Sequence, residues 1–240
     1  MIYEAEELKR LIDNAKYAVF FGGAGVSTDS GIPDFRGTGG LYSSDEGQEY
    51  YLSHSCLFEE PEKFYEFFKQ NMMLDGIGPN DAHYALAALE REGKIKAVIT
   101  QNIDCLHQRA GSKRVIELHG TSERFYCARC GKIYSPDHVL SCGGVPVCDA
   151  CGGLVRPDVT LYGEGLDGFS FSEAEQEVQR ADLLIVAGTS LTVYPAAGLV
   201  ADYSGEHLVI INYTPTPYDS MADMVISGSI SEVLGQIVKQ

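Results

Sequence analysis

Two pairs of cysteines constrain this chain more than any other feature of its sequence. Cys127 and Cys130 form one pair and Cys148 and Cys151 the other; each pair encloses two residues, and residues 131–147 separate the pairs. Two short turns at this spacing bring four thiolates to one tetrahedral zinc ion and leave no ligand position for water. We therefore predict one structural Zn2+ rather than two disulfides or four unrelated thiols.

Cysteine usage and apolar patterning indicate the compartment. Seven cysteines, four of them in zinc spacing, suit a reducing environment, and Cys142, which has no paired neighbour, is expected to be free. The acidic N-terminus lacks the basic and apolar regions of a signal peptide, and no apolar run approaches the length of a membrane span. We expect a cytoplasmic protein that does not enter a membrane.

The charge bears on binding partners. A formal net charge of −16 argues against binding to the phosphate backbone of nucleic acids. An acidic surface attracts lysine-rich protein segments instead, although solubility alone accounts for most such charge. We expect no direct nucleic-acid binding, and the sequence shows no exposed apolar stripe of an obligate dimer, so a monomer is expected.

Short, β-branched apolar runs alternate with amphipathic stretches along the chain. Runs of this kind are typical of strands that are buried on both faces of a sheet, and the alternation predicts an α/β fold with a Rossmann-like, doubly wound parallel sheet. The expected strands are residues 18–21, 97–100, 115–118, 183–187, 208–211 and 224–226. The expected helices are residues 4–14, 82–91, 172–180 and 231–239.

Polar residues follow five of these strands. Ligands bind at the carboxyl ends of the strands in such sheets, so these groups are expected to converge on one cleft. The strand-end groups are residues 22–25, 101–104, 119–120 and 188–190 and Asn212.

Two stretches interrupt the alternation. Residues 37–80 are rich in Tyr and Phe and are expected to form a helical insert, and residues 121–158 hold the four cysteines. Both leave and rejoin the sheet, so we expect them to pack together as a smaller domain beside a larger one made of residues 1–36, 81–120 and 159–240. The cleft would lie between the two domains.

The glycine loop after the first strand is a weak dehydrogenase signal. Gly23, Ala24 and Gly25 begin a G-x-G-x-x-G pattern, but Thr28 occupies the position of the third glycine. The small residues and the hydroxyls of Ser27 and Thr28 favour a phosphate cradle over an ordinary tight turn. The following Pro-Asp-Phe-Arg at residues 33–36 suits an ordered lid over a ligand.

Taken together, six strings resemble the signatures of the sirtuins, the NAD-dependent protein-lysine deacylases. They occur in the order of the family and cover nearly the whole chain. The strings are GAGVSTDSGIPDFRG at 23–37, TQNID at 100–104, LHG at 118–120, the four cysteines, RPDVTLYGE at 156–164 and GTSLTVYPAA at 188–197.

This resemblance implies a mechanism. Nicotinamide leaves NAD, the acyl oxygen of an acetylated lysine captures the anomeric carbon, and the products are deacetylated lysine and O-acetyl-ADP-ribose. His119 would be the general base that activates a ribose hydroxyl, and Asn102 would orient the ribose and a water molecule. The resemblance assigns NAD binding to Gly23, Ala24, Gly25, Ser27, Thr28, Asp34, Phe35, Arg36, Gln101, Asn102, Ile103, Asp104, His119, Gly188, Thr189, Ser190, Asn212 and Ile230.

The same resemblance places the substrate between two segments of the chain. A peptide carrying the acetylated lysine would lie as a strand between residues 159–164 and 192–194, with loose side-chain preference. The residues implied to contact it are Val159, Tyr162, Gly163, Glu164 and Val193. The chain departs from the family pattern at Gly22, Thr160 and Tyr162, which bears on acyl preference rather than on the chemistry.

The acyl class can also be predicted. Sirtuins that remove succinyl or malonyl groups carry a Tyr and an Arg three residues apart, and Phe68 and Asn71 stand at those positions here. Without the cation a buried carboxylate would be unpaired, so neutral acyl groups are expected. Two other functional classes are open. One is protein ADP-ribosyl transfer in the same cleft, and the other is a zinc module or NAD-binding regulator without catalysis.

Overall fold

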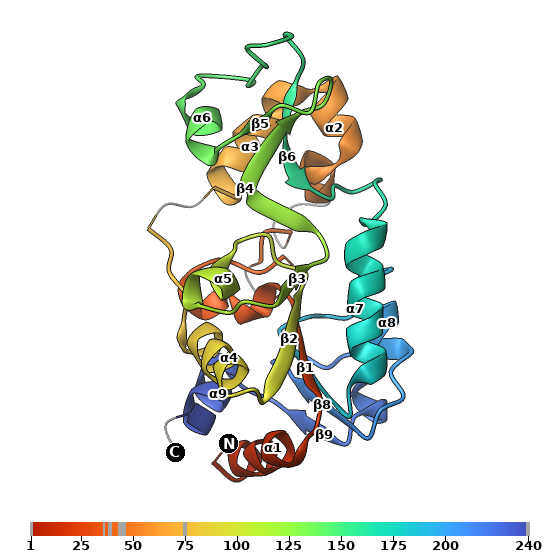
Figure 1. Ribbon diagram of the computed structural model, residues 1–240. Helices are drawn as coiled ribbons and strands as arrows, with labels where there is room; N and C mark the ends of the chain where they lie inside the picture. The colour runs from red at the N-terminus through yellow and green to blue at the C-terminus, as the bar shows by residue number, and fades with distance from the viewer. Residues whose placement is uncertain (1, 36, 38–39, 43–46, 74–75, 239–240) are drawn as a thin grey trace.

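The computed structural model describes residues 2–35, 37, 40–42, 47–73 and 76–238, and its larger part is built on a six-stranded sheet (Figure 1). The strands of this sheet are β1 (Ala18–Gly22), β2 (Ile95–Thr100), β3 (Val115–Glu117), β7 (Leu183–Ala187), β8 (His207–Ile211) and β9 (Met224–Ile226). Their order is β3-β2-β1-β7-β8-β9, and every neighbouring pair is parallel. The predicted doubly wound parallel sheet is confirmed, and the chain reverses its direction of winding between β1 and β7.

Helices cover both faces of this sheet. Helices α1 (Ile2–Asn14), α4 (Asp81–Arg91) and α9 (Ile230–Val238) share one buried cluster with one face, and α7 (Gly168–Arg180) and α8 (Gly198–Ala201) share a second cluster with the other. Strand β1 shows why, because Phe20 belongs to the first cluster while Val19 and Phe21 belong to the second. This sheet is therefore buried on both sides, as its continuous apolar strands predict.

The predicted helices and strands of this sheet are all present, with ends that differ by a few residues. The largest difference is at α7, which begins at Gly168 rather than near Ser172. Asp167 caps the helix by accepting a hydrogen bond from the backbone N–H of Ser170 at 2.8 Å. That cap extends the helix over a glycine that by itself disfavours helix.

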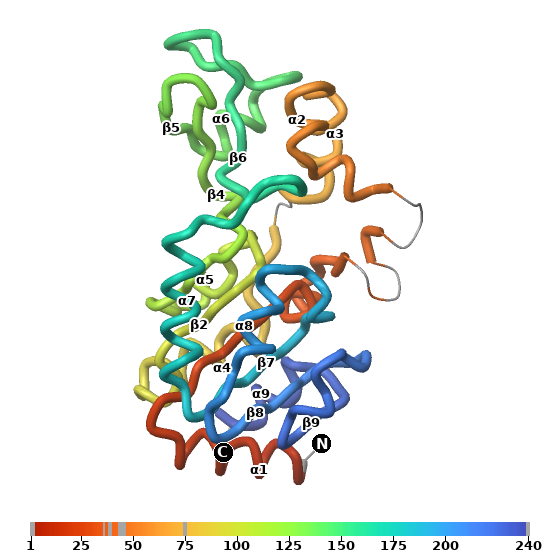
Figure 2. The backbone as a smooth tube through the Cα atoms, turned by 90° about the vertical axis from the view of Figure 1, so that its right-hand side faces the viewer, coloured from red at the N-terminus to blue at the C-terminus, as the bar shows by residue number. Residues whose placement is uncertain are grey.

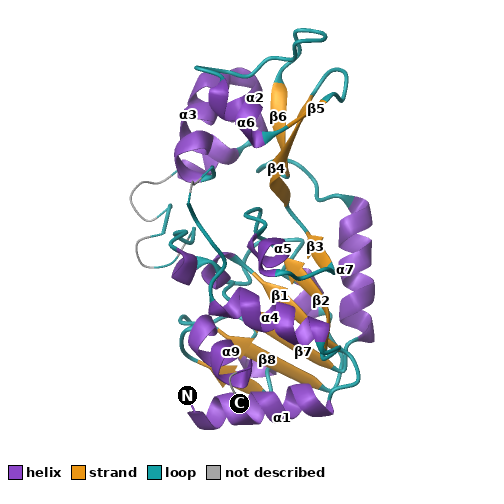
Figure 3. Cartoon of the chain, turned by 60° about the vertical axis from the view of Figure 1, so that its left-hand side comes forward, coloured by secondary structure: helices purple, strands orange, loops and turns teal. Residues whose placement is uncertain are grey.

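Helices and strands from the two interrupting stretches gather in a smaller part of the molecule, at the top of Figure 2. An antiparallel sheet of β4 (Gly120–Cys127), β5 (Ile133–Tyr134) and β6 (Val155–Val159) lies beside helices α2 (His54–Glu59), α3 (Pro61–Asn71) and α6 (Pro136–Ser141) (Figure 3). Phe64, Tyr65 and Phe68 of α3 share one buried cluster with Phe125 and Val155 of the sheet. The Lys69 ammonium also donates to the carbonyl of Cys142 at 2.7 Å.

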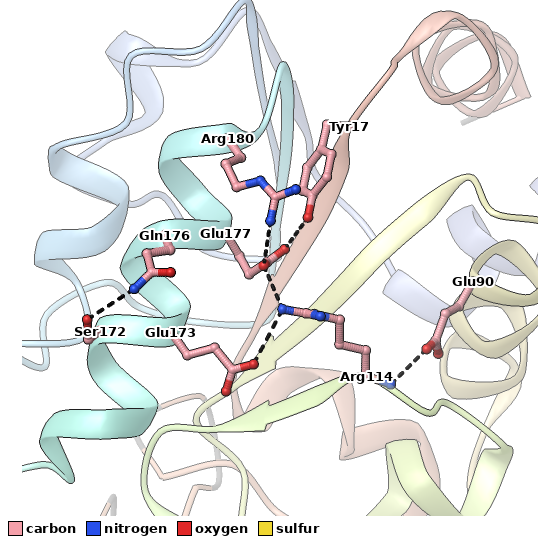
Figure 4. Close-up of polar contacts among 8 residues, drawn as sticks. All are labelled: Tyr17, Glu90, Arg114, Ser172, Glu173, Gln176, Glu177 and Arg180. Carbon is pink, nitrogen blue, oxygen red and sulfur yellow. Dashed lines mark hydrogen bonds and ion pairs between the residues drawn. The ribbon is translucent and has the colours of Figure 1, made fainter.

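One buried carboxylate fastens α7 to the sheet (Figure 4). Glu177 is 1% exposed, accepts from the Tyr17 hydroxyl at 2.7 Å and pairs with Arg114 at 2.7 Å. Arg180 approaches the same carboxylate at 3.5 Å. Because Arg114 immediately precedes β3, this network holds the strand that leads to His119.

Within these described residues, no helix combines the length and the apolar character needed to cross a membrane.

Candidate active site

A cavity of about 980 Å³ is lined by residues of both the larger and the smaller part. All sequence-predicted NAD and peptide residues that the structure describes line it, and Arg36 lies outside the described residues. They are Gly23, Ala24, Gly25, Ser27, Thr28, Asp34, Phe35, Gln101, Asn102, Ile103, Asp104, Val159, Tyr162, Gly163, Glu164, Gly188, Thr189, Ser190, Val193, Asn212 and Ile230, together with His119.

The glycine loop lies at the point where the sheet reverses its winding. The N–H of Gly25, after β1, donates to the carbonyl of Gly188, after β7, at 2.8 Å. A Cβ on Gly25 would stand 2.7 Å from Gly188 Cα, and one on Gly188 would stand 2.5 Å from the backbone nitrogen of Val26. Gly188 also has a φ of +61°. Only glycines allow these two backbones to meet, and they leave a small-residue floor that a ligand can approach closely.

Three predicted polar residues form one hydrogen-bonded chain behind this floor. The hydroxyl of Ser27, which is fully buried, donates to Asp104 Oδ2 at 2.7 Å and accepts from the Asn102 amide at 3.1 Å. The other carboxylate oxygen of Asp104 accepts from the N–H of Leu106 at 2.9 Å, at the start of α5 (Leu106–Ala110). Asp104 therefore orients a helix and faces the cavity at the same time, and the amide of Asn102 is fixed in one orientation.

His119 lies in the short connection between β3 and β4, immediately before Gly120, the first residue of β4. Its Nδ1 lies 2.9 Å from the carbonyl oxygen of Gln101. A carbonyl oxygen only accepts, so Nδ1 carries the proton and Nε2 carries the lone pair. Burial lowers the pKa of His119, and the hydrogen bond to Gln101 opposes that shift only in part. The imidazole is therefore neutral at pH 7 and able to accept a proton.

Side chains from neighbouring strand ends hold the rest of the floor together. The Gln101 amide donates to the Thr189 hydroxyl at 3.0 Å, and the Asn212 amide donates to the Thr189 carbonyl at 3.2 Å. The hydroxyl of Ser190 lies 2.8 Å from that of Thr192. The ends of β2, β7 and β8 are thus linked into one rigid edge.

Phe35 connects the glycine loop with the smaller part. Its carbonyl accepts from the N–H of Tyr42 at 2.9 Å, and the two rings lie 5.3 Å apart. Tyr42 in turn lies 6.4 Å from the ring of Tyr162. The half-buried Phe35 packs against the core of the smaller part, and its predicted role as a lid residue stays a prediction.

An ion pair stabilises residues 159–164, the segment that is predicted to bind the substrate peptide. Arg156, 8% exposed, binds both carboxylate oxygens of Glu164, at 2.6 and 2.9 Å. Glu164 also accepts from the N–H of Leu161 at 2.9 Å. Glu164 lines the cavity, but its carboxylate is engaged by the protein, so it shapes the segment around Tyr162.

The cavity also contains residues that the sequence did not single out. Met72, Met73 and Arg109 line it. Asn80 is not among the lining residues but supports the glycine loop, because its amide donates to the Val26 carbonyl at 2.8 Å. No local signal marks any of these residues, since their positions depend on contacts between segments that are distant in sequence.

The four predicted metal ligands converge as their spacing requires. The sulfurs of Cys127, Cys130, Cys148 and Cys151 all lie within 4.8 Å of one another. Four convergent cysteine sulfurs are the donor set that a tetrahedral structural zinc ion takes. Cys142 is not part of this cluster; its thiol donates to the His138 carbonyl at 3.2 Å.

Cys105, beside the site, is not an activated thiol. Burial raises its pKa to about 12, and its sulfur lies 2.9 Å from the Thr121 hydroxyl. A thiol of this kind stays protonated, which is the state of a packing residue.

Comparison with known proteins decides the family. A model described as the Sir2 family matches residues 23–195, which include the glycine loop, the histidine and all four cysteines. The chain belongs to the Sir2 family. Proteins named NAD-dependent protein deacetylase resemble it over nearly their full lengths: one from Clostridium tetani is 51% identical, covering 98% of this chain and 97% of the relative, and one from Clostridium acetobutylicum is 48% identical, covering 99% of each.

Solved Sir2 structures share the fold of this family member. A Sir2 protein with a p53 peptide and NAD+ is 44% identical, with a TM-score of 0.88 over 98% of this chain and 97% of that one. A Sir2 variant with a deacetylated p53 peptide and 3'-O-acetyl ADP-ribose is 42% identical, with a TM-score of 0.91 over 98% of each chain. The predicted family and fold are confirmed.

Proposed function

We propose that this chain is an NAD-dependent protein-lysine deacetylase that transfers the acetyl group of a lysine to ADP-ribose and releases nicotinamide. The observation that carries this function is the position of His119, which lines the same cavity as the Gly25–Gly188 floor and has its Nδ1 hydrogen bonded to the Gln101 carbonyl. The names of the relatives, and the peptide and NAD+ complexes of Sir2 proteins, agree with it. They give no support to the alternative of ADP-ribosyl transfer to a protein.

Each part of the cavity then has a chemical task in the proposal. The glycine floor and the Ser27 and Thr28 region would receive the pyrophosphate, and Asp104 would accept from the nicotinamide carboxamide. Asn102, fixed by Ser27, would orient the ribose. His119 would take the proton of a ribose hydroxyl once the acyl oxygen has captured the anomeric carbon.

Burial of the intermediate and binding of the peptide would be shared by both parts of the molecule. Phe35 would keep water from the intermediate, and residues 159–164 and Val193 would flank the peptide as it adds a strand. The four cysteines would hold one zinc ion, whose contribution is to fold the smaller part and not to react.

The wider organisation is proposed on the same basis. We assign residues 1–36, 81–120 and 159–240 to an NAD-binding domain, and residues 37–80 and 121–158 to a small domain. Partners would be proteins that carry acetylated lysines, met by a monomer in the cytoplasm. The net charge of −16 argues against nucleic acid as a further partner.

Peptide-dependent NAD turnover tests this function. The native chain should release nicotinamide from NAD only when an acetyl-lysine peptide is present, with O-acetyl-ADP-ribose and deacetylated peptide formed in equal amounts. Mass spectrometry of the peptide and chromatography of the nucleotides measure all three products. Nicotinamide release without deacetylated peptide would contradict the proposal and point to transfer or hydrolysis.

The acyl class is a second expected result. Phe68 and Asn71 line the cavity, and the Asn71 amide is occupied by the Phe67 carbonyl at 2.8 Å. With no cation at that point, a succinyl carboxylate would lose its hydration without an ion pair, so kcat/KM for acetyl-lysine should exceed that for succinyl-lysine by roughly 10²-fold or more. Competition between matched peptides measures the ratio.

Arg109 provides the control for this result, because it is the arginine among the described residues that line the cavity. A preference for succinyl-lysine would contradict the prediction. Its loss in Arg109→Gln would then identify that guanidinium as the group that binds the carboxylate.

A further inference from the structure

The four-cysteine cluster is contacted by a tyrosine hydroxyl. Tyr134, on β5, is 8% exposed, and its hydroxyl lies 3.0 Å from the sulfur of Cys148. Cys148 is itself buried, at 2% exposure, whereas Cys130 is exposed. The hydroxyl of a buried side chain on the small sheet thus lies within hydrogen-bond distance of the buried sulfur.

Two charged residues fix the position of that hydroxyl. Asp149, next to Cys148 in sequence, accepts from the Tyr134 hydroxyl through Oδ1 and donates its own N–H to the Tyr134 oxygen at 3.2 Å. The Lys132 ammonium lies 2.6 and 2.7 Å from the two carboxylate oxygens of Asp149 and 5.3 Å from the centre of the Tyr134 ring. Tyr134 is therefore held by two hydrogen bonds to Asp149 at its hydroxyl and by the Lys132 ammonium near its ring.

The negative charge of a zinc–cysteine site explains why a hydrogen bond to the buried sulfur of Cys148 would be stabilising. Four thiolates around one Zn2+ carry a net charge of −2, and a buried thiolate has no water to stabilise its share of it. A hydrogen bond to that sulfur is strengthened by its charge and by the dry surroundings. It stabilises the negative charge on the ligating sulfur and holds that sulfur in the orientation that faces the other three.

Lys132 affects how the single proton of the Tyr134 hydroxyl is shared between its two acceptors. The hydroxyl has two acceptors, the Asp149 carboxylate and the Cys148 sulfur, and a bare carboxylate would be the stronger one. The carboxylate oxygen lies 2.5 Å from the hydroxyl and the sulfur 3.0 Å, and the ammonium of Lys132, paired with the carboxylate, weakens it as an acceptor and so favours sharing of the proton with the sulfur.

We propose that Tyr134, positioned by Asp149 and Lys132, is an outer-shell residue that retains the zinc ion by donating a hydrogen bond to Cys148. This inference rests on the assignment of zinc to the four cysteines and not on the deacetylase activity. Partners of this kind orient ligands and tune metal affinity without touching the metal.

Replacing Tyr134 with phenylalanine tests the proposal. Zinc affinity, measured on the zinc-loaded full chain by competition with a chromophoric chelator, should fall by roughly 10- to 100-fold in Tyr134→Phe. Tyr126→Phe is the matched control, because Tyr126 lies on the adjacent β4 with its ring against Arg156. It should retain native affinity.

Cobalt supplies a readout that a packing defect would not reproduce. In the Co2+-loaded chain, loss of a hydrogen bond to sulfur should move the sulfur-to-cobalt charge-transfer band to lower energy in Tyr134→Phe and leave it in place in Tyr126→Phe. Native zinc affinity in Tyr134→Phe, or weaker affinity with an unmoved band, would overturn the proposal.

A milder variant covers the case in which Tyr134→Phe does not fold. Lys132 is exposed, so Lys132→Met should fold, and its zinc affinity should lie between those of the native chain and Tyr134→Phe. Native zinc affinity in Lys132→Met would contradict the role of Lys132 and Asp149 in positioning the Tyr134 hydroxyl. A chain that binds zinc as expected but turns over no NAD would contradict the proposed function and leave this inference standing.

Discussion

Alanine in place of His119 is expected to lower kcat for deacetylation by 10²- to 10⁴-fold, the usual contribution of a positioned general base. The hydrogen bond from Nδ1 to the Gln101 carbonyl fixes the tautomer whose Nε2 accepts the proton. Alanine removes that acceptor without adding bulk to the cavity. Formation of O-acetyl-ADP-ribose from NAD and an acetyl-lysine peptide measures the loss.

The step at which His119 acts gives this prediction a sharper form. The proposed base acts after nicotinamide has left, so exchange of labelled nicotinamide into NAD should fall much less in His119→Ala than deacetylation does. His207→Ala is the matched control, because His207 is half-exposed at the start of β8. Equal losses of exchange and deacetylation would instead place His119 in ligand binding, and native activity would exclude it as the base.

The sequence was sufficient for the sheet because each strand is apolar on both faces. Phe20 and its neighbours Val19 and Phe21 can only be buried if helices cover both sides, and the strand-end position of the polar residues then follows from parallel winding. The sequence also predicts that the backbone at the glycine loop can be approached closely, because Gly25 has no side chain. The structure shows that a Cβ at this position would collide with Gly188.

Contacts between distant segments could not be predicted in this way. Asn80 supports the glycine loop through Val26, and Arg156 occupies the carboxylate of Glu164; neither partner is implied by a local pattern. The sequence therefore places Glu164 among the residues expected to contact the peptide, but it does not predict the ion pair that engages the Glu164 carboxylate. The burial of His83 and His107 is likewise beyond a local pattern, because a sequence does not show how completely an imidazole is enclosed.

These two histidines form a buried pair between α4 and α5. His83 is fully buried and His107 is 1% exposed, and their ring centres lie 4.7 Å apart. His83 Nδ1 accepts from the N–H of Asn80 at 3.2 Å, whereas His83 Nε2 and both ring nitrogens of His107 make no hydrogen bond to the described residues. Burial lowers the pKa of His83 to about 4 and that of His107 to about 3.

The chain should therefore lose stability steeply in mild acid. Between pH 6.5 and 5 the unfolded chain binds protons at both histidines and the native chain does not, so the free energy of unfolding falls as the pH falls. Each histidine contributes up to ~1.4 kcal/mol per pH unit, and about 1.6 kcal/mol in total between pH 6.5 and 5. Urea unfolding at several pH values measures this slope.

Substitution separates the pair from the carboxylates, which also titrate in this range. His107→Leu keeps an apolar side chain at the buried position but cannot take a proton, so its unfolding free energy should fall less steeply with acid, by ~1.4 kcal/mol per pH unit. His207→Leu, at a half-exposed histidine, should keep the native slope. If His107→Leu and the native chain showed the same slope, His107 would already be protonated in the native state, and its burial would not govern the acid sensitivity of the fold.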